Sequence, residues 1–542
     1  MRRLCAVALL ASLFASLPRM EAQPASPPSR APKLAVILVV DQMRADYIEI
    51  SRALWRGGFR RLLTEGAVFE RGEYPYMNTV TCAGHATLGT GAYPHTHGMT
   101  LNAWYDRTRR ISVSCTDDAE SPLVSYGREG RIGTSGRLLL APTLADELRA
   151  VNPDARVVTM SLKARSAIGL AGHGGTAVTW VDDGAGSFVT AKAFAQAPVP
   201  AVADFLKRDP IDADGTKSWT LRDAPATYRY PDSSVGARPP SGRTNFFPHR
   251  VGTAKGPDPQ FFSLWQSSPY SDAYLGRMAA AMIDSFALGQ RDGTDFLGVS
   301  LSALDLVGHA YGPESREVED MLRRLDDTVG ALMDHLDAKV GRGNWVLGFS
   351  ADHGVAPVPA AAGGGRIVTD DVRDRIEETL TTRWGTRTDG YVAAVTFDYV
   401  YLAPGVFDRL KADAAAYAEL EKAVAGVPGI VRMLRADRLS DTSPDREVRA
   451  AALSHVPDRS GDLVLVGKPF WFFGGRGDTS GTTHGTAHPY DRQVPVILLG
   501  AGIKPGRYGQ AASPADIAPT LAQLIGVKMT KAEGRVLKEG LK

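Results

Sequence analysis

The sequence of 542 residues has few cysteines and no excess of charge of either sign. Because only 3 cysteines occur, neither a disulfide-rich scaffold nor a cysteine-based zinc finger fits this chain. Lys and Arg number 62 against 60 Asp and Glu, which gives a formal net charge of +2. Non-specific binding of nucleic acid needs a basic excess or stripe, so we expect no nucleic-acid partner.

Long apolar runs are also scarce, and the one that stands out lies near the N-terminus. It covers residues 4–17 after two arginines, and it is shorter than the roughly 20 residues of a membrane helix. A positive start, a short apolar segment and a small residue at Ala22 are typical of a secretory signal. We predict a signal peptide at 1–22, a disordered leader at 23–33, and a periplasmic or secreted protein without a membrane span; an uncleaved anchor is the alternative.

Five shorter apolar runs predict strands that are covered on both faces. They are residues 34–40, 156–160, 296–301, 345–349 and 494–499. Such runs favour an α/β fold with a largely parallel sheet flanked by helices on both faces. Four of them end in polar residues, and functional groups gather beyond the carboxyl ends of strands in sheets of this kind.

Helical signals lie between these runs and after the last of them. Apolar residues spaced three and four apart predict a helix from Val318 to Leu336, and a capping-box-like start at Ser513 predicts another that ends at Gly526. Two stretches interrupt the alternation of predicted strands and helices. We therefore expect a catalytic domain at 34–542 with cleft-shaping insertions at about 185–275 and 365–475.

Carboxylates and imidazoles near the predicted strand ends form the strongest functional signal. The candidates are Asp41, Asp305, His309, Asp352, His353 and His484. Oxygen and imidazole ligands without thiolate suit an open catalytic zinc site, and this number of ligands suits two Zn²⁺ ions. Because such ligands bind metal only when deprotonated, activity should favour alkaline pH.

A threonine at the start of a predicted helix supplies a candidate nucleophile. Thr81 precedes a small-residue segment, and the helix N-terminus would present free N–H groups to an anion. A metal-bound hydroxyl can ionise and attack phosphorus. Cys82 is the rival nucleophile, and it either pairs with Cys115 or stays reduced. His85 is expected to contact and position the ligand residues without binding metal itself.

Together these residues resemble the alkaline phosphatase superfamily, in order from about Leu34 to Ile525. The chain looks most like the bacterial phosphate-irrepressible alkaline phosphatases with a threonine nucleophile, because Thr81 is accompanied by Asn102 and by Lys163-Ala-Arg165. The resemblance implies that Asn102, Lys163 and Arg165 bind the non-bridging phosphoryl oxygens.

The resemblance also divides the ligands between two zinc ions. Asp305, His309 and His484 would hold the ion that activates water and steadies the leaving oxygen. Asp41, Thr81, Asp352 and His353 would hold the ion that activates the nucleophile. His488 is a rival for His484, but the glycine that follows His484 matches the family pattern better.

The expected function is that of an exported alkaline phosphatase that scavenges phosphate from diverse monoesters through a phosphothreonine intermediate.

 The substrates are small phosphate esters, and a monomer is expected. A phosphodiesterase or nucleotide pyrophosphatase on the same two-zinc scaffold is the alternative; it would need an apolar pocket for a second ester group and no Lys/Arg pair.

Other functional classes fit the sequence less well. A sulfatase of this superfamily needs a proline and an arginine two and four residues after its nucleophile, and the residues after Cys82 lack both. A phosphoglycerate mutase would need no export signal. A non-catalytic binding protein would have lost a ligand cluster or the nucleophile. The insertion loops are further candidate sites for structural Ca²⁺.

Overall fold

The computed structural model describes residues 31–128, 133–478 and 480–542. The predicted signal peptide at 1–22 and most of the leader at 23–33 lie outside these residues. Within the described ranges, no helix combines the length and the apolar character that crossing a membrane requires.

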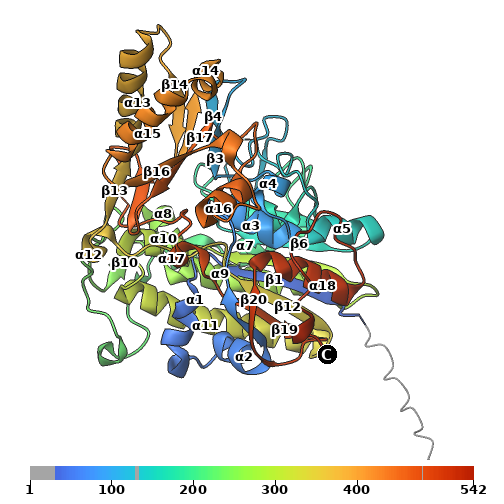
Figure 1. The fold of residues 1–542 in the computed structure, drawn as a ribbon. Helices are drawn as coiled ribbons and strands as arrows, with labels where there is room; N and C mark the ends of the chain where they lie inside the picture. Colours follow the sequence, from blue (N-terminus) through green and yellow to red (C-terminus); the bar gives the residue numbers. More distant parts are fainter. Residues whose placement is uncertain (1–30, 129–132, 479) are drawn as a thin grey trace, which may run out of the picture. The chain divides into compact units, whose positions relative to one another are not determined.

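A ten-stranded sheet organises the chain, in the order β20-β2-β19-β12-β1-β11-β6-β7-β8-β5 (Figure 1). The strands are β1 (Leu34–Val40), β2 (Ala67–Gly72), β5 (Leu123–Ser125), β6 (Val157–Ser161), β7 (Ala177–Asp182), β8 (Ser187–Ala191), β11 (Asp295–Leu301), β12 (Trp345–Ser350), β19 (Val496–Gly500) and β20 (Gly506–Ala512). The five neighbours β12, β1, β11, β6 and β7 all pair in parallel. The predicted α/β architecture with a largely parallel sheet is therefore confirmed.

All five predicted apolar runs are strands of this sheet, namely β1, β6, β11, β12 and β19. The last of them, β19, runs antiparallel to its neighbours β12 and β2. An apolar run records burial on both faces but carries no information on strand direction, so the sequence pattern did not distinguish β19 from the parallel strands.

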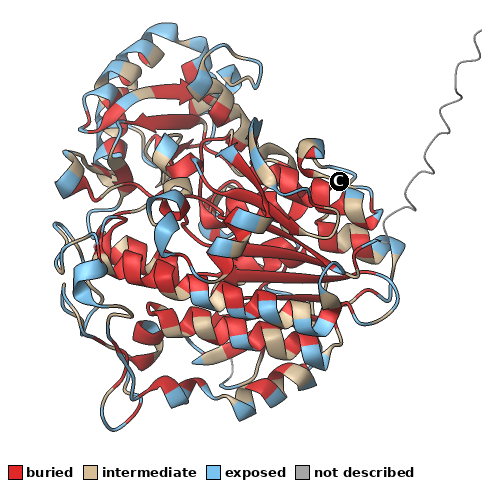
Figure 2. Ribbon diagram, turned by 90° about the horizontal axis from the view of Figure 1, so that it is seen from below, coloured by how far each residue is buried: buried red, intermediate tan, exposed pale blue. Residues whose placement is uncertain are grey.

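Helices cover both faces of the sheet. They include α2 (Gly58–Glu65), α9 (Pro269–Ser285), α10 (Ala303–Tyr311) and α11 (Arg316–Leu336) together with α3 (Thr81–Thr90), α5 (Leu144–Val151), α6 (Ala164–Ala171) and α18 (Ile517–Ile525). Val36 and Leu38 of β1 belong to the core shared with α9 and α11, whereas Ile37 and Val39 belong to the core shared with α5 and α18. Figure 2 shows the strands buried and the outward helix faces exposed.

The two predicted helices follow their sequence signals closely. Helix α11 begins after Ser315, whose side chain accepts a hydrogen bond from the backbone N–H of Val318. A capping box at Ser513 opens a short 3₁₀ turn that continues into α18, and Gly526 ends α18 in the left-handed conformation. These local signals were sufficient because each one satisfies backbone groups at a helix end.

Segment 365–475 contains a sheet of its own, in the order β14-β15-β17-β16. Its elements are β13 (Gly365–Val368), α13 (Thr369–Trp384), β14 (Val392–Thr396), β15 (Tyr399–Leu402), α14 (Val406–Ala412), α15 (Ala414–Ala425), β16 (Ile430–Arg435), α16 (Arg446–Ser454), β17 (Leu463–Gly467) and β18 (Trp471–Gly474). The gold and orange elements in Figure 1 show this grouping. A separate hydrophobic cluster, including Ile376, Leu420 and Leu465, forms its core.

Shorter elements complete the fold. They are α1 (Ala45–Ile50), α4 (Pro94–His97), β3 (Ala103–Asp106), β4 (Ile111–Ser114), α7 (Pro200–Arg208), β9 (Ser218–Trp219), β10 (His249–Arg250), α8 (Phe261–Gln266), α12 (Pro359–Ala362) and α17 (Pro489–Arg492). Segment 185–275 contains β8, the short elements α7, α8, β9 and β10, two short 3₁₀ turns at Ile211–Asp214 and Pro225–Thr227, and the start of α9.

Candidate active site and metal centre

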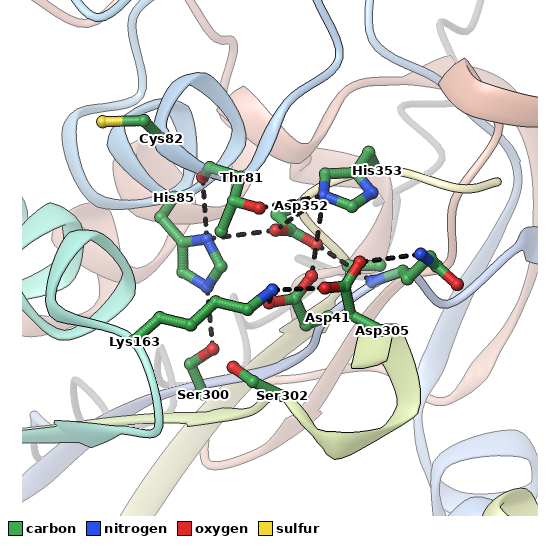
Figure 3. Close-up of polar contacts among 12 residues, drawn as sticks. Asp41, Thr81, Cys82, His85, Lys163, Ser300, Ser302, Asp305, Asp352 and His353 are labelled. Atoms are coloured by element: carbon green, nitrogen blue, oxygen red, sulfur yellow. Dashed lines mark hydrogen bonds and ion pairs between the residues drawn. The ribbon is translucent and has the colours of Figure 1, made fainter. Parts of the chain in front are cut away.

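The parallel strands bring the predicted site residues to one edge of the sheet. Asp41 follows β1, Asp305 lies in the first turn of α10 after β11, and Asp352 follows β12. Because β12, β1 and β11 are parallel neighbours, their carboxyl ends meet at the same edge. The adjacent strand β6 places Lys163 there as well (Figure 3).

Two groups of side chains at this edge could each hold a metal ion. Asp305, His353 and His484 form one group, and Asp41, Asp352 and His353 form the other, with ligand atoms within 4.8 Å of one another in each. His353 therefore lies between the two groups, and its ring stacks on that of His484 with centroids 3.4 Å apart. The sixth predicted ligand, His309, has its Nε2 3.1 Å from Oδ1 of Asp305.

Backbone carbonyls orient all three imidazoles. The Nδ1 atoms of His309, His353 and His484 lie 2.8–2.9 Å from the carbonyl oxygens of Thr482, Gly354 and Thr79, respectively. A proton on Nδ1 satisfies these contacts and leaves the lone pair of Nε2 directed at the carboxylates. Hydrogen bonds of this kind commonly orient metal-binding histidines and fix their tautomer.

Two buried carboxylate oxygens indicate that the residues fit cations. Oδ1 of Asp41 and Oδ2 of Asp352 have no hydrogen-bond partner among the described residues, and both side chains are fully buried. Leaving a buried carboxylate oxygen unpaired is costly, whereas coordination of a divalent cation would compensate it. The donor set of carboxylates and imidazoles is one that zinc prefers.

Lys163 occupies an unexpected place. The resemblance implies contact with phosphoryl oxygens, but its Nζ lies 2.7 Å from Oδ2 of Asp41 and 2.5 Å from Oδ2 of Asp305 (Figure 3). The ammonium group thus bridges a carboxylate of each ligand group. Clustered buried carboxylates attract the nearest cation, which explains this position.

The electrostatics of the cluster follow from burial and from neighbouring charges. Burial, reinforced by the Asp352 carboxylate, raises the pKa of Asp41 to about 6. Burial opposes ionisation of Asp305 as well, but His309 and Lys163 outweigh it and hold the pKa of Asp305 well below its ordinary value. Burial and the neighbouring His353 lower the pKa of His484, which favours the neutral imidazole that metals bind.

Thr81 lies at the start of α3, beside these groups. Its side chain is 1% exposed, and its Oγ1 is 3.3 Å from Nε2 of His353. A cavity of about 350 Å³ opens in front of it, lined also by Asn102 and Arg165. Oδ1 of Asn102 accepts a hydrogen bond from the backbone N–H of Cys82 over 2.8 Å, whereas Nε of Arg165 has no partner among the described residues.

Cys82 is not available as the rival nucleophile. It forms a disulfide with Cys115, and its sulfur points away from the cluster (Figure 3). The pairing that the sequence left open is therefore present.

His488 does not compete with His484 as a metal ligand, because its Nε2 lies 3.0 Å from the carbonyl oxygen of Gly467. The expected supporting residue His85 contacts the carbonyl oxygen of Thr81 at 2.9 Å.

Sequence reasoning missed Gln42, which links the two ligand groups. Its backbone N–H donates to Oδ1 of Asp352 over 3.1 Å, and its Nε2 donates to Oδ1 of Asp305 over 2.7 Å. The residue has a φ of 68°, and a Cβ at Gly308 would lie 1.8 Å from its Oε1. The sequence feature that could have identified Gln42 is its position directly after Asp41, at the end of the predicted strand 34–40.

Sequence reasoning also missed two aromatic residues of segment 365–475. Phe397 and Phe473 line the cavity that contains Thr81. Nothing in their sequence neighbourhood distinguishes them from core aromatics, because their place at the cavity depends on how the segment packs.

Known proteins resemble this chain along nearly its whole length. The sequence profile described as type I phosphodiesterase/nucleotide pyrophosphatase matches residues 35–491. Alkaline phosphatase PhoV of Synechococcus elongatus is 31% identical over 531 residues, which cover 94% of this chain and 93% of that protein. Alkaline phosphatase PafA of Elizabethkingia meningoseptica is 32% identical over 531 residues, covering 94% of both. A crystal structure of wild-type PafA matches with a TM-score of 0.85 at 30% identity, covering 96% of this chain and 100% of that one.

Proposed function

Because the chain belongs to the type I phosphodiesterase/nucleotide pyrophosphatase family, within the alkaline phosphatase superfamily, we propose that it is an exported phosphomonoesterase. It hydrolyses small phosphate monoesters through a phosphothreonine intermediate and releases phosphate. The observation that carries this proposal is the position of Thr81, whose Oγ1 faces two carboxylate–imidazole groups and shares one cavity with Asn102 and Arg165.

The proposed metal ligands start from the two groups, with His309 added to the first because it lies beside Asp305, and His353 assigned to the second. Asp305, His309 and His484 would hold one Zn²⁺, and Asp41, Asp352, His353 and Thr81 would hold the other. Bound divalent cations supply Lewis acidity, which lowers the pKa of a coordinated hydroxyl and neutralises charge on a leaving oxygen. Gln42 and the backbone carbonyls keep the ligands in place before substrate arrives.

The reaction proceeds in two displacements at phosphorus. The deprotonated Oγ1 of Thr81 attacks in line, the bond to the leaving oxygen breaks, and the alcohol departs with a proton. Water then attacks the phosphothreonine, and Thr81 recovers its proton as phosphate leaves. The positive end of α3 and the backbone N–H groups of its first turn favour the negative charge on the phosphoryl group.

Three side chains are proposed to recognise the phosphoryl oxygens. Arg165 lines the cavity, so its guanidinium can donate to an anionic oxygen, while Asn102 is held beside the first turn of α3. Lys163 adds positive charge next to Asp41 and Asp305. A monoester dianion carries one more charge than a diester, so these cations favour monoesters.

Phosphodiester hydrolysis is the second candidate. Apolar residues in the cavity, including Leu101, Phe397 and Phe473, could accept a second ester group. Comparison of kcat/KM for p-nitrophenyl phosphate and bis-p-nitrophenyl phosphate tests the choice. We expect the monoester to be favoured by at least about 100-fold, since charge-assisted hydrogen bonds contribute about 1.5–3 kcal/mol each. Preference for the diester would refute the proposed function.

Export is proposed on two grounds. The predicted signal precedes the described residues, and the Cys82–Cys115 disulfide suits an oxidising compartment such as the periplasm or the extracellular space. N-terminal sequencing of the protein recovered from the periplasm and the culture medium tests this part; recovery only from the cytoplasm would contradict it.

A further inference from the structure

Segment 365–475 builds one wall of the cavity in front of Thr81. Phe397 lies in the turn between β14 and β15, and Phe473 lies in β18. Their ring centroids are 5.4 Å apart with the planes tilted by 54°. Both rings line the cavity together with Asp305, His309 and His484. An aromatic pair, of which Phe397 is half-buried and Phe473 is buried, therefore lines the space where a substrate would lie.

The backbone at Phe397 is held in a conformation that aromatic residues rarely adopt. Its φ is 58°, in the left-handed region. Bulky residues persist there only where their surroundings fix them, and such positions cluster at ligand sites. The next residue, Asp398, is buried, and its Oδ1 accepts a hydrogen bond from Nδ2 of Asn78 over 2.7 Å. Because Asn78 is close to Thr81 in the chain, this bond ties the turn to the nucleophile segment.

The ring of Phe397 lies on the side of the cavity formed by the loop of His484. A Cβ at Gly485 would come within 2.5 Å of this ring, so the loop accommodates the aromatic side chain by having glycine there. Asp478 also lines the cavity, but its carboxylate is paired with Arg366 over 3.2 Å. The wall thus presents an apolar aromatic surface with little net charge.

We propose that Phe397 and Phe473 form a leaving-group subsite that favours phosphate monoesters of aromatic or benzylic alcohols over those of small aliphatic alcohols. The inference rests on the proposed function, in which Asp305, His309 and His484 surround the leaving oxygen. A group attached to that oxygen would lie in the cavity that Phe397 and Phe473 line together with these three residues. Flat apolar groups gain contact energy and ring stacking there, whereas a small alkyl group does not reach both rings.

Benzyl phosphate and ethyl phosphate provide the test, because their alcohols are similarly poor leaving groups and differ in the ring. For the full-length enzyme, we expect Phe397→Ala to lower the benzyl-to-ethyl ratio of kcat/KM by about fivefold, in line with the energy of an aromatic pair. Phe397→Tyr retains a ring and should keep the ratio within twofold of the wild-type value. Phe473→Ala tests the second ring and should lower the ratio as well.

Phe470 offers a matched control. It is also a phenylalanine with positive φ, at 66°, and its ring stacks on Tyr490 with centroids 5.6 Å apart. It lines a different groove, with Arg44 and Pro357. Phe470→Ala should therefore leave the benzyl-to-ethyl ratio unchanged.

The possible results separate the subsite from the proposed function. A lower ratio in both alanine variants, with the control unchanged, supports the subsite. An unchanged ratio in a folded, active Phe397→Ala enzyme, or an equal fall in the Phe470→Ala control, overturns it. If wild-type enzyme hydrolysed neither monoester, the proposed function itself would fail. Thermal unfolding of each variant shows whether it folds. If Phe397→Ala does not fold, the benzyl-to-ethyl ratio of the Phe473→Ala enzyme decides whether the subsite exists.

Discussion

Cys82 and Cys115 form a disulfide that joins the first turn of α3 to the end of β4. Two hydrogen bonds accompany it. The backbone N–H of Cys82 donates to Oδ1 of Asn102, and the backbone N–H of Cys115 donates to the carbonyl oxygen of Asn102. The residue that follows the proposed nucleophile Thr81 is thus tied to a residue proposed to bind phosphate.

Loss of this disulfide should affect both stability and turnover. The double variant Cys82→Ser/Cys115→Ser opens a loop with a sequence separation of 33, which should lower the free energy of unfolding by about 3 kcal/mol. Because the two backbone N–H groups that hold Asn102 lose the covalent link between them, we also expect a fall of about tenfold in kcat/KM. Denaturant unfolding and p-nitrophenyl phosphate hydrolysis measure the two effects. Wild-type turnover in the folded double variant would contradict the positioning argument.

Substitution of Thr81, the proposed nucleophile, should abolish most catalysis while leaving metal binding intact. Thr81→Ala should retain bound zinc, because all six proposed carboxylate and imidazole ligands remain, yet lose turnover by at least about 1,000-fold. Elemental analysis and initial rates check the two outcomes. Thr90→Ala, at the far end of the same helix α3, is the control and should keep its rate. Near wild-type turnover by Thr81→Ala would point to another nucleophile.

The cations near the cavity should matter more for monoesters than for diesters. Arg165→Ala and Lys163→Ala should each lower kcat/KM for p-nitrophenyl phosphate by about 10- to 100-fold, since each removes charge-assisted contacts, and lower the rate on its bis-ester much less. Arg137→Ala is a suitable control because that side chain is 57% exposed and pairs with Asp118. Equal losses on both substrates would refute the assigned roles.

Gln42 should tune metal affinity without coordinating metal. Gln42→Leu removes the amide that donates to Asp305 while conserving bulk, and changes in such supporting contacts typically weaken metal binding by about 10- to 100-fold. Competition of the apoenzyme with a chromogenic zinc chelator measures the affinity. Gln196→Leu, on an exposed surface position, should bind zinc as wild type does. Equal affinities of the two variants would show that the Gln42 contact is dispensable.

Asp398 should make stability depend on pH. Burial raises its pKa from the ordinary 3.8 to about 7. Between about pH 4 and pH 7 the folded protein therefore holds this proton more tightly than the unfolded chain, and stability falls as pH rises. Asp398→Asn cannot ionise and keeps an acceptor for Asn78. Its stability relative to wild type should grow by roughly 2–4 kcal/mol from pH 4 to pH 7 and stay constant above it.

Denaturant unfolding at pH 4, 7 and 9 measures this difference. Asp408→Asn is the control, because its side chain is 80% exposed and pairs with Lys411 at the surface. A stability difference between Asp398→Asn and wild type that does not change with pH would contradict ionisation of the buried carboxyl.

Much of the fold, and the meeting of the candidate metal ligands at one edge of the sheet, could be predicted from local sequence. Strands buried on both faces appear as continuous apolar runs, and parallel neighbours must end at the same edge, so Asp41, Asp305 and Asp352 were expected to meet there. The helix over 318–336 was equally visible, because its apolar face repeats every three to four residues. The direction of β19 was not visible, because burial alone does not encode strand direction.

The sequence by itself determined which chemical groups are present and which of them follow strand ends, since backbone periodicity and strand length are local properties. Only the tertiary structure decided that His353 lies between both ligand groups, that Lys163 bridges Asp41 and Asp305, and that Phe397 reaches the cavity of Thr81. Several of these relationships join residues far apart in the sequence; Lys163, for example, is 122 positions from Asp41 and 142 from Asp305. They depend on strand order, side-chain rotamers and the packing of segment 365–475, which no short stretch of sequence specifies.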